Sequence, residues 1–391
     1  MSQSATYARP TKVFNKEFVI LLIVNFLSFF NIQMLQSNII TYINGLTAAS
    51  FVISLVPVVY SIVAMAMRPV SGVCLDRFDK KMLVIVSEIG LTVSCLAYLF
   101  ADTSTLVIVI RAVNGIFFGL NTTAVMALSG EVLPEEKMNS GLGIFGLSTV
   151  VSMAMGPTVG DFIVRAMGYE VMFCIAAATT LVAAVLMAGI RARKPEKKEK
   201  KGIVLSDLFA MEAMLPCLII LFDSVAMAVI TNYLLLYGQE IGVANISLFF
   251  TIYSAALLVI RPFVSKISDT LNPKYLIYPC QIMITVCMVL LGLAKSMPMI
   301  VVAAILFGIG YGAVSPILQA MALKSVPESR RGAASGTYYF AMDIANILIP
   351  LCCAGLFNIF AGYASSYLIM SVAPLIGVAV LFFYKGDLLD K

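Results

Sequence analysis

The sequence contains no histidine and no tryptophan, and only 12% of its 391 residues are charged. Without histidine, imidazole metal sites and histidine-based catalytic triads are excluded, and any proton relay must use carboxylates, tyrosine, lysine or water. Soluble domains carry about 25% charged residues. Because so few charges cannot cover a water-soluble fold of this length, the composition excludes a soluble enzyme, a nucleic-acid-binding protein and a disordered chain.

Apolar residues make up 61% of the chain, and its mean hydropathy is +0.98. A helix needs about 20 mostly apolar residues to cross the hydrocarbon core of a membrane. By this criterion the sequence predicts an all-α polytopic membrane protein with 12 transmembrane helices. The predicted spans are 17–43, 48–72, 81–101, 105–130, 139–165, 170–190, 211–238, 246–268, 274–294, 298–323, 332–360 and 364–384. The cysteines lie in apolar segments without a CxxC pair, so we predict no metal site and no cofactor.

The segment 191–210 differs from the rest because it opens with RARKPEKKEKK and has no apolar run. We interpret it as a basic linker between an N-terminal bundle, 1–190, and a C-terminal bundle, 211–391. Nearly all Lys and Arg fall in connections on one side of the predicted helices, whereas Arg165 and Lys295 fall on the other. The positive-inside rule therefore predicts a multi-pass protein of the cell (plasma or inner) membrane, with both termini and the linker in the cytoplasm.

The two halves of the sequence resemble each other when one is shifted by 193 residues. This shift places Arg68-Pro69 on Arg261-Pro262, Asp76 on Asp269, Gly115 on Gly308, Gly119 on Gly312 and Pro157 on Pro350. The coincidences predict two pseudo-symmetric six-helix bundles, related by an axis along the membrane normal. Such pairs usually hold a substrate site at their interface and expose it to each side in turn.

The connection after the second span, Gly72 to Lys81, places an acid beside a cluster of bases. Asp76 can accept hydrogen bonds at a helix N-terminus, while Arg77 and Lys81 hold the loop in the cytoplasm. The segment resembles the loop signature G-x-x-x-D-R/K-x-G-R/K-R/K of the major facilitator superfamily, with an aspartate at its second glycine. The second half keeps Asp269 from this motif. We assign these residues to gating.

In the fourth span, Arg111, Asn114 and Gly115 follow one another at helical spacing. A mid-membrane arginine costs about 2.5 kcal/mol or more unless it is paired or hydrated. The pattern resembles the R-x-x-Q-G motif of the superfamily, with Asn114 in place of glutamine. The resemblance implies a part in proton transfer for Arg111, and a purely structural tie between helices is the alternative.

The fifth span contains Gly156, Pro157 and Gly160, which permit a kink or a close helix approach. It resembles the G-x-x-x-G-P-x-x-G-G signature of exporters that work as antiporters, with Ser152 and Asp161 replacing the terminal glycines. The resemblance points to the 12-helix drug/proton antiporter branch and to gating by this segment. A Gly-Pro kink without that role is the alternative.

Acidic residues inside predicted spans must be protonated, paired or hydrated. Resemblance to the superfamily implies that Asp223 and Asp343 lie on cavity or interface helices and face Arg111. We assign these three, together with Glu88, to proton coupling. For the two aspartates, the alternative is a buried ionic or hydrogen-bonded contact between helices. For Glu88, the two expectations are that it lines a cytoplasmic crevice or that it reaches toward the lipid headgroups. Near a helix end, Glu131 is a gating residue or simply interfacial.

Polar side chains at helical spacing on the expected cavity helices form the predicted substrate site. They are Asn31, Gln36, Asn114, Asn232, Tyr233, Tyr311, Gln319, Tyr339 and Asn346. In the tenth span, Tyr311, Ser315 and Gln319 lie at i, i+4 and i+8, on one helix face. Amides and phenols among Phe and Met make a mixed pocket that suits an amphiphilic solute.

These observations predict a secondary active transporter that works by alternating access and is not an enzyme. We expect a monomer that exports a small amphiphilic or cationic organic compound in exchange for protons, as in multidrug efflux; sodium stays open as the coupling ion. Its expected partners are the substrate, protons and the lipid bilayer, without nucleic acid. A proton symporter or facilitative importer of a metabolite is the main alternative, followed by a non-transporting membrane receptor.

Overall fold

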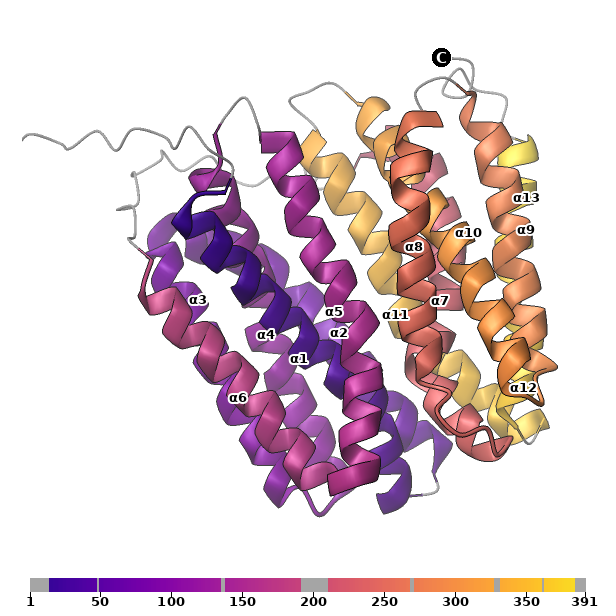
Figure 1. Cartoon of the computed structure of the whole chain (residues 1–391), viewed down its shortest axis with the longest axis horizontal. Helices are drawn as coiled ribbons and strands as arrows, with labels where there is room; N and C mark the ends of the chain where they lie inside the picture. Colours follow the sequence, from indigo (N-terminus) through magenta and orange to yellow (C-terminus); the bar gives the residue numbers. More distant parts are fainter. Residues whose placement is uncertain are drawn as a thin grey trace, which may run out of the picture.

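The computed structural model describes residues 14–47, 49–134, 138–190, 210–267, 271–326, 331–360 and 362–383 (Figure 1). In these ranges all regular secondary structure is helical. The α-helices are α1 (Lys16–Leu46), α2 (Ser50–Arg77), α3 (Lys80–Ala97), α4 (Ser104–Val132), α5 (Met138–Met167), α6 (Tyr169–Ala188), α7 (Met214–Glu240), α8 (Leu248–Ile267), α9 (Pro273–Gly292), α10 (Met297–Lys324), α11 (Arg331–Phe360), α12 (Tyr363–Met370) and α13 (Val372–Phe383). Short 3-10 helices, Tyr98–Phe100 and Met211–Ala213, extend α3 and lead into α7.

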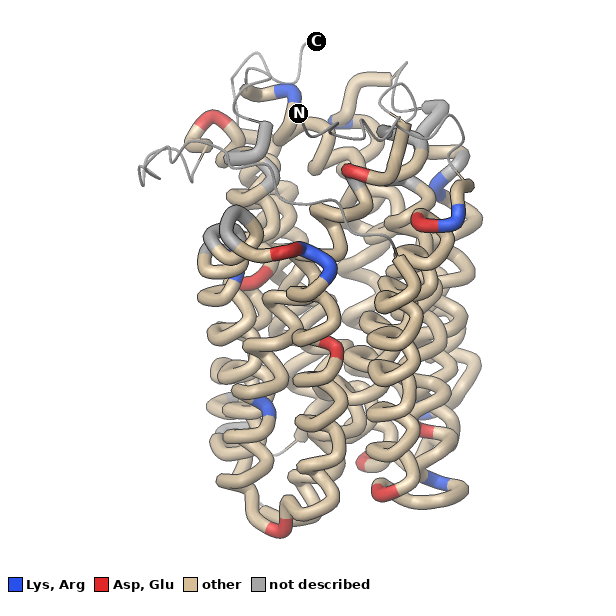
Figure 2. The backbone as a smooth tube through the Cα atoms, turned by 90° about the vertical axis from the view of Figure 1, so that its left-hand side faces the viewer, with Lys and Arg blue, Asp and Glu red and all other residues tan. Residues whose placement is uncertain are grey.

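The helices confirm the predicted all-α membrane fold. Among the described residues, 11 stretches of helix are long and apolar enough to cross a membrane, and α8 adds a shorter apolar run, Leu248–Arg261. One of the 11, Tyr363–Phe383, consists of α12 and α13 with an interruption at Ser371, where the sequence predicted a continuous helix. Figure 2 shows charged positions gathered mainly near the two ends of the molecule, as expected when the middle faces lipid.

The chain forms two halves of six spans each, α1 to α6 and α7 to α13, which lie side by side (Figure 1). Between the halves, α1 packs on α7, α2 on α11 and α5 on α8. Within them, α4 packs on α2 in the same way as α10 packs on α8.

Glycines at repeat-related positions allow these two equivalent helix pairs to approach closely. A Cβ atom on Gly119 would lie 2.7 Å from the carbonyl oxygen of Ala64, and one on Gly312 would lie 2.8 Å from Cγ of Leu257. Gly119 and Gly312 are 193 positions apart in the sequence, and so are their contact residues Ala64 and Leu257. The glycine coincidences therefore mark equivalent helix contacts in the two halves.

Short connections make successive spans antiparallel, so both halves begin and end at the same face of the molecule. We call this face, where α1 begins and α10 ends, the linker side, and the other face the opposite side. The chain enters α3 on the linker side, where Asp79 caps the helix by accepting hydrogen bonds from the backbone N–H of Lys81 at 2.8 Å and of Met82 at 3.3 Å. The aspartate that replaces the second glycine of the loop signature is thus a helix cap.

Candidate functional site: a cavity between the two halves

A cavity of about 2140 Å³ lies between the two halves. It is lined by α1, α2, α4 and α5 from the first half and by α8, α10 and α11 from the second. Its walls extend from the middle of these helices to Lys324 and Ser325 at the end of α10 and to Asn272 before α9. The cavity therefore reaches the linker side. Pockets for drug-sized ligands measure about 300–1,000 Å³, so there is room for a large organic solute.

Hydrogen bonds between the halves join the helices toward the opposite side. Ser37 Oγ donates to the carbonyl oxygen of Thr231 at 2.8 Å, linking α1 to α7. Ser247, which directly precedes α8, donates through Oγ to Asp161 Oδ2 of α5 at 2.6 Å. Within α5, Arg165 Nε donates to Asp161 Oδ1 at 2.9 Å. Asp161, which stands where the exporter signature has its last glycine, thus makes a cross-half contact. The structure has a cavity on the linker side and packed halves on the opposite side.

Asp343 pairs with Arg68 across the interface. Nη2 of Arg68, in α2, lies 3.0 Å from Oδ2 and 3.2 Å from Oδ1 of Asp343, in α11. Both residues line the cavity. The prediction that Asp343 faces Arg111 is corrected here, because the closeness of α2 to α11 brings a different arginine to this carboxylate.

Arg111 is completely buried, and neutral groups bind it. Its Nη2 donates to Oε1 of Gln36, its Nη1 lies 3.4 Å from Oδ1 of Asn114, and its guanidinium carbon lies 4.2 Å from the ring centroid of Tyr60. None of its described partners is a carboxylate. Gln36 also donates through Nε2 to Oδ1 of Asn232 at 2.9 Å. Arg111 in α4 is thereby connected through α1 to α7 in the other half.

Glu88 and Asp223 are buried inside the halves, away from the cavity lining, which corrects their predicted positions. Oε1 of Glu88, in α3, accepts hydrogen bonds from Ser28 Oγ and from Asn121 Nδ2, the latter at 2.7 Å. It reaches neither a crevice nor the headgroups. Oδ2 of Asp223, in α7, accepts from Gln281 Nε2 in α9 at 3.0 Å and does not face Arg111. Both carboxylates have the geometry of ties between helices of one half.

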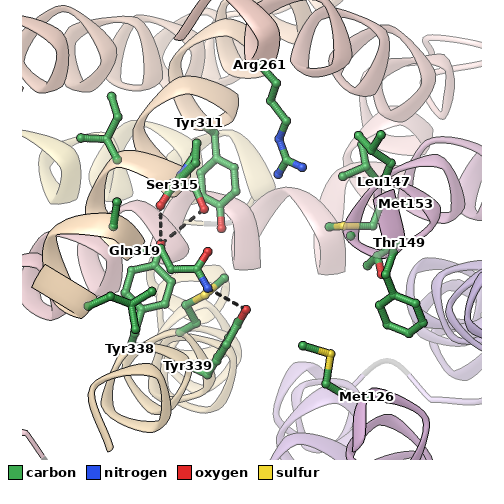
Figure 3. A pocket seen from close by; sticks show the side chains of 18 of the residues that line it. Met126, Leu147, Thr149, Met153, Arg261, Tyr311, Ser315, Gln319, Tyr338 and Tyr339 are labelled. Carbon is green, nitrogen blue, oxygen red and sulfur yellow. Dashed lines mark hydrogen bonds between the residues drawn. The ribbon is translucent and has the colours of Figure 1, made fainter. Parts of the chain in front are cut away.

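Four predicted substrate residues, Tyr311, Gln319, Tyr339 and Asn346, line the cavity from α10 and α11. Figure 3 shows Tyr311, Gln319 and Tyr339 on one wall, where Gln319 Nε2 donates to the hydroxyl of Tyr339 at 3.0 Å. Ser315 joins them, and its carbonyl oxygen accepts a hydrogen bond from the Tyr338 hydroxyl at 2.9 Å. The predicted face of the tenth span therefore faces the cavity.

The other five predicted substrate residues lie outside the described lining: Asn31, Gln36, Asn114, Asn232 and Tyr233. They connect helices instead. Asn31 Nδ2 donates to the carbonyl oxygen of Ala176 at 2.7 Å, and the Tyr233 hydroxyl to that of Pro350 at 3.2 Å. Their donors bond to groups on neighbouring helices, because no water is present in the hydrocarbon region to accept these bonds.

The glycines predicted for gating bring α5 against α1. A Cβ atom on Gly156 would lie 2.7 Å from Cβ of Gln33, and one on Gly160 would lie 2.7 Å from Cγ of Met34. Pro157 lies within α5 between them. These contacts are inside the first half, so the segment shapes the helix that carries Asp161 to the interface.

The charged gating candidates lie on the linker side. Glu131 pairs with Lys80, joining the end of α4 to the start of α3. Lys81 Nζ donates to the carbonyl oxygens of Ala188 and Ile190, at 2.8 and 2.6 Å, and so satisfies the end of α6. Gly72, Asp76 and Arg77 lie in the last turns of α2, with side chains outside the described set, and Asp269 also lies outside the described residues.

Two arginines that line the cavity, Arg68 and Arg261, were not predicted as site residues. Both appeared in the sequence only as members of the repeated Arg-Pro pair. An arginine kept in both halves at the same position was the available signal.

Comparison with known proteins agrees with this architecture. The family model described as Major Facilitator Superfamily matches residues 21–350 and, in a second match, 217–390. "Multi-drug resistance efflux pump PmrA" of Streptococcus pneumoniae is 23% identical over 348 residues, covering 85% of this chain and 86% of that protein. "Multidrug resistance protein 1" of Bacillus subtilis is 23% identical over 381 residues, covering 95% and 97%.

Solved structures share the fold at low sequence identity. A structure of the nucleoside transporter NupG superimposes with a TM-score of 0.80 and 12% identity, covering 95% of this chain and all, 100%, of that one. A POT family transporter in complex with a thioalcohol-conjugated peptide gives a TM-score of 0.77 at 15% identity, covering 96% and 98%. These likenesses show a common arrangement of helices.

Proposed function

The chain belongs to the major facilitator superfamily, and on that premise we propose that it exports small amphiphilic organic compounds in exchange for protons. The observation that carries the proposal is the Arg68–Asp343 pair, which joins the two halves inside a large cavity of mixed polarity. The relatives named as multidrug resistance proteins support the class of substrate, and the one named as an efflux pump supports the direction. The Gly-Pro segment of α5, similar to that of exporters, supports the direction independently.

We propose that the linker side is cytoplasmic, as the distribution of Lys and Arg predicts. The structure then represents the state that loads substrate from the cytoplasm. Rocking of one half against the other closes this side and opens the opposite one. For this, the hydrogen bonds of Ser37, Gln36 and Asp161 to the second half must break.

Asp343 is the proposed proton site. A proton that binds this carboxylate removes its charge and with it the attraction to Arg68, which weakens the contact of α2 with α11. The proton favours the state in which the Arg68–Asp343 pair is broken. Substrate and proton compete to bind in the same cavity, so that each drives the release of the other. A ligand shifts a conformational equilibrium only by its difference in affinity between the states. For the proton, this difference arises because Asp343 binds it more weakly while paired with Arg68 than when the pair is broken.

Arg111 acts in this scheme as part of the seal on the opposite side. Its bond to Gln36 orients the amide that in turn donates to Asn232 of the other half. Glu88 and Asp223 hold α3 and α9 within their own halves and leave the rocking to the interface.

Purified protein in liposomes with an imposed pH gradient tests the proposal. Dansylcadaverine, a fluorescent amphiphilic amine, and related dansyl compounds serve as probes, with protein-free liposomes as the control. We expect probe to move out of the compartment on the linker side as protons move in, and the pH gradient to dissipate faster when probe is present. Movement of probe and protons in the same direction would establish the symporter instead, and no flux of any probe would contradict transport of this class.

A further inference from the structure

Arg261 of α8 is a cation in the cavity for which the described residues supply no counter-ion. Its side chain points into the open space between the polar and apolar walls (Figure 3). Within the described part of the chain it makes no ion pair or hydrogen bond, and its Nε is buried without a partner. The titratable groups that act on it electrostatically are the neutral phenols of Tyr253, Tyr311, Tyr338 and Tyr339.

The internal repeat shows what Arg261 lacks. Its counterpart in the first half, Arg68, has Asp343 as its counter-ion. The position equivalent to Asp343 in the first half is Val150, 193 residues earlier, which lines the cavity near the α5 wall. The arginine is thus present in both halves, whereas the acid is present at this position in the second half and is Val150 in the first. A partly buried guanidinium whose protein counter-ion is missing is a site for an anion from outside the protein.

The charges of the whole cavity point the same way. Its described charged side chains are Arg68, Arg261, Lys324 and Asp343, three cations and one anion. Since Asp343 is already paired with Arg68, the remaining charge is positive. A cationic solute would be repelled there, and the repulsion grows as the two halves close and exclude water.

The two walls of the cavity differ in polarity. Tyr311, Ser315, Gln319 and Tyr339 carry hydroxyl and amide groups on the side of α10 and α11 (Figure 3). On the side of α4 and α5, Leu147, Met153 and Met126 present apolar side chains, with Thr149 between them, whose hydroxyl accepts a hydrogen bond from Asn25. A solute with one charged end and an apolar body can satisfy both walls at once. A uniformly polar solute would leave the apolar wall without a contact.

We propose that the cavity binds an amphiphilic carboxylate, with Arg261 as its counter-ion and the apolar wall of α4 and α5 against its body. Guanidinium binds carboxylate through two parallel N–H···O bonds, and the nearby phenols can donate further hydrogen bonds to the same oxygens. This names the substrate class of the exporter and rests on the function proposed above. It revises the sequence-based expectation of an amphiphilic or cationic compound toward an anion.

Three probes that share one fluorophore test the charge preference. They are dansyl-6-aminohexanoate, its uncharged amide and the amine dansylcadaverine, and each is titrated into the purified full chain in neutral detergent. We expect wild-type protein to bind the carboxylate about tenfold more tightly than the amide, because a charge-assisted hydrogen-bonded pair contributes affinity of this size. The amine should bind most weakly. Arg261→Gln should bring the carboxylate and the amide to within about twofold. Arg261→Lys, which keeps the charge, should retain part of the preference.

Two further charge removals separate a contact from a general field. Lys295→Gln removes an exposed cation on the opposite side and should leave the preference unchanged. Lys324→Gln removes a cation at the mouth and should reduce the preference far less than Arg261→Gln does. Equal effects of Lys324→Gln and Arg261→Gln would overturn the assignment, as would a wild-type preference for the amine or an unchanged preference in a folded Arg261→Gln protein. Gel filtration and thermal unfolding establish that this variant is folded.

The same probes in liposomes separate this proposal from the export mechanism. Proton-driven export of the amine or amide but not of the carboxylate would leave the exporter standing and overturn the anion site. Carboxylate binding that depends on Arg261, without proton-driven movement of any probe, would leave the site standing and contradict export.

Discussion

Arg68 and Asp343, 275 residues apart in sequence, form an ion pair between the two halves of the protein at an N···O distance of 3.0 Å. Their side chains keep 45% and 20% of their surface exposed, so the pair is reachable from the cavity. Exposed ion pairs contribute about 0–1 kcal/mol. A single proton on the carboxylate can therefore release a contact between α2 and α11 without a large loss of stability, which suits a bond that breaks in every cycle.

Asp343→Asn should uncouple export from the pH gradient. The amide cannot carry the proton, so we expect the steady-state probe ratio across proteoliposomes to fall to about one while downhill movement continues. In wild-type protein, the rate of export should rise as the pH falls in the compartment that receives the probe. In Asp343→Asn, the rate should no longer depend on this pH. Asp102→Asn, an exposed acid on the opposite side, is the matched control. Uphill export at the normal rate by Asp343→Asn would remove this residue from the coupling mechanism.

Asn232→Ala should loosen the opposite side. The substitution removes the acceptor of the Gln36 amide, a hydrogen bond worth about 0.5–1.5 kcal/mol, and should raise the open population about two- to tenfold. Electron-electron distance measurements between spin labels at positions 102 and 295, in a cysteine-free background, report that population as a longer distance. Gln36→Ala should have the larger effect, because it also removes a partner of Arg111. Unchanged distances in both variants would show that these bonds do not seal this side.

Glu88→Gln should transport normally. If the carboxylate is a tie, a glutamine oxygen can accept the same bonds from Ser28 and Asn121. Glu88→Ala removes the acceptor of the buried Asn121 amide, while Ser28 keeps the carbonyl oxygen of Val24, and should lower stability by about 1–3 kcal/mol. Thermal unfolding and proton-driven export, measured on the same preparations, separate the two effects. Loss of uphill export in a stable Glu88→Gln protein would restore the proton-coupling role expected from the sequence. Asp223→Asn, next to Gln281, provides the same comparison in the second half.

Gly156→Ala should destabilise the first half, because the new Cβ atom meets Cβ of Gln33 at 2.7 Å and the backbone nitrogen of Met34 at 3.0 Å. Overpacking of this kind costs about 1–3 kcal/mol. Gly146→Ala in the same helix is the control, since its Cβ atom would have no neighbour within 4 Å. A lower melting temperature is expected for the first variant alone, and equal melting of the two would mean that α5 moves away from α1 at no cost.

The membrane fold followed from the sequence because each span carries its own signal: an apolar run long enough to cross the bilayer needs no information from the rest of the chain. The repeat was equally visible, since Gly119 and Gly312 must be small wherever two helices touch. The cavity face of α10 was predicted because Tyr311 and Gln319 share one face at helical spacing. The interruption at Ser371 was missed, as the apolar run continues through it.

Only the tertiary structure decided which charges meet. A sequence gives the spacing of residues along a helix but not the rotation of that helix against its neighbours, and a long apolar helix carries little information about which face turns inward. Packing of α2 on α11 therefore brings Arg68 into contact with Asp343, and packing of α9 on α7 brings Gln281 into contact with Asp223. Among the described residues, Arg261 has no acid beside it, because the position equivalent to Asp343 in the first half is occupied by Val150.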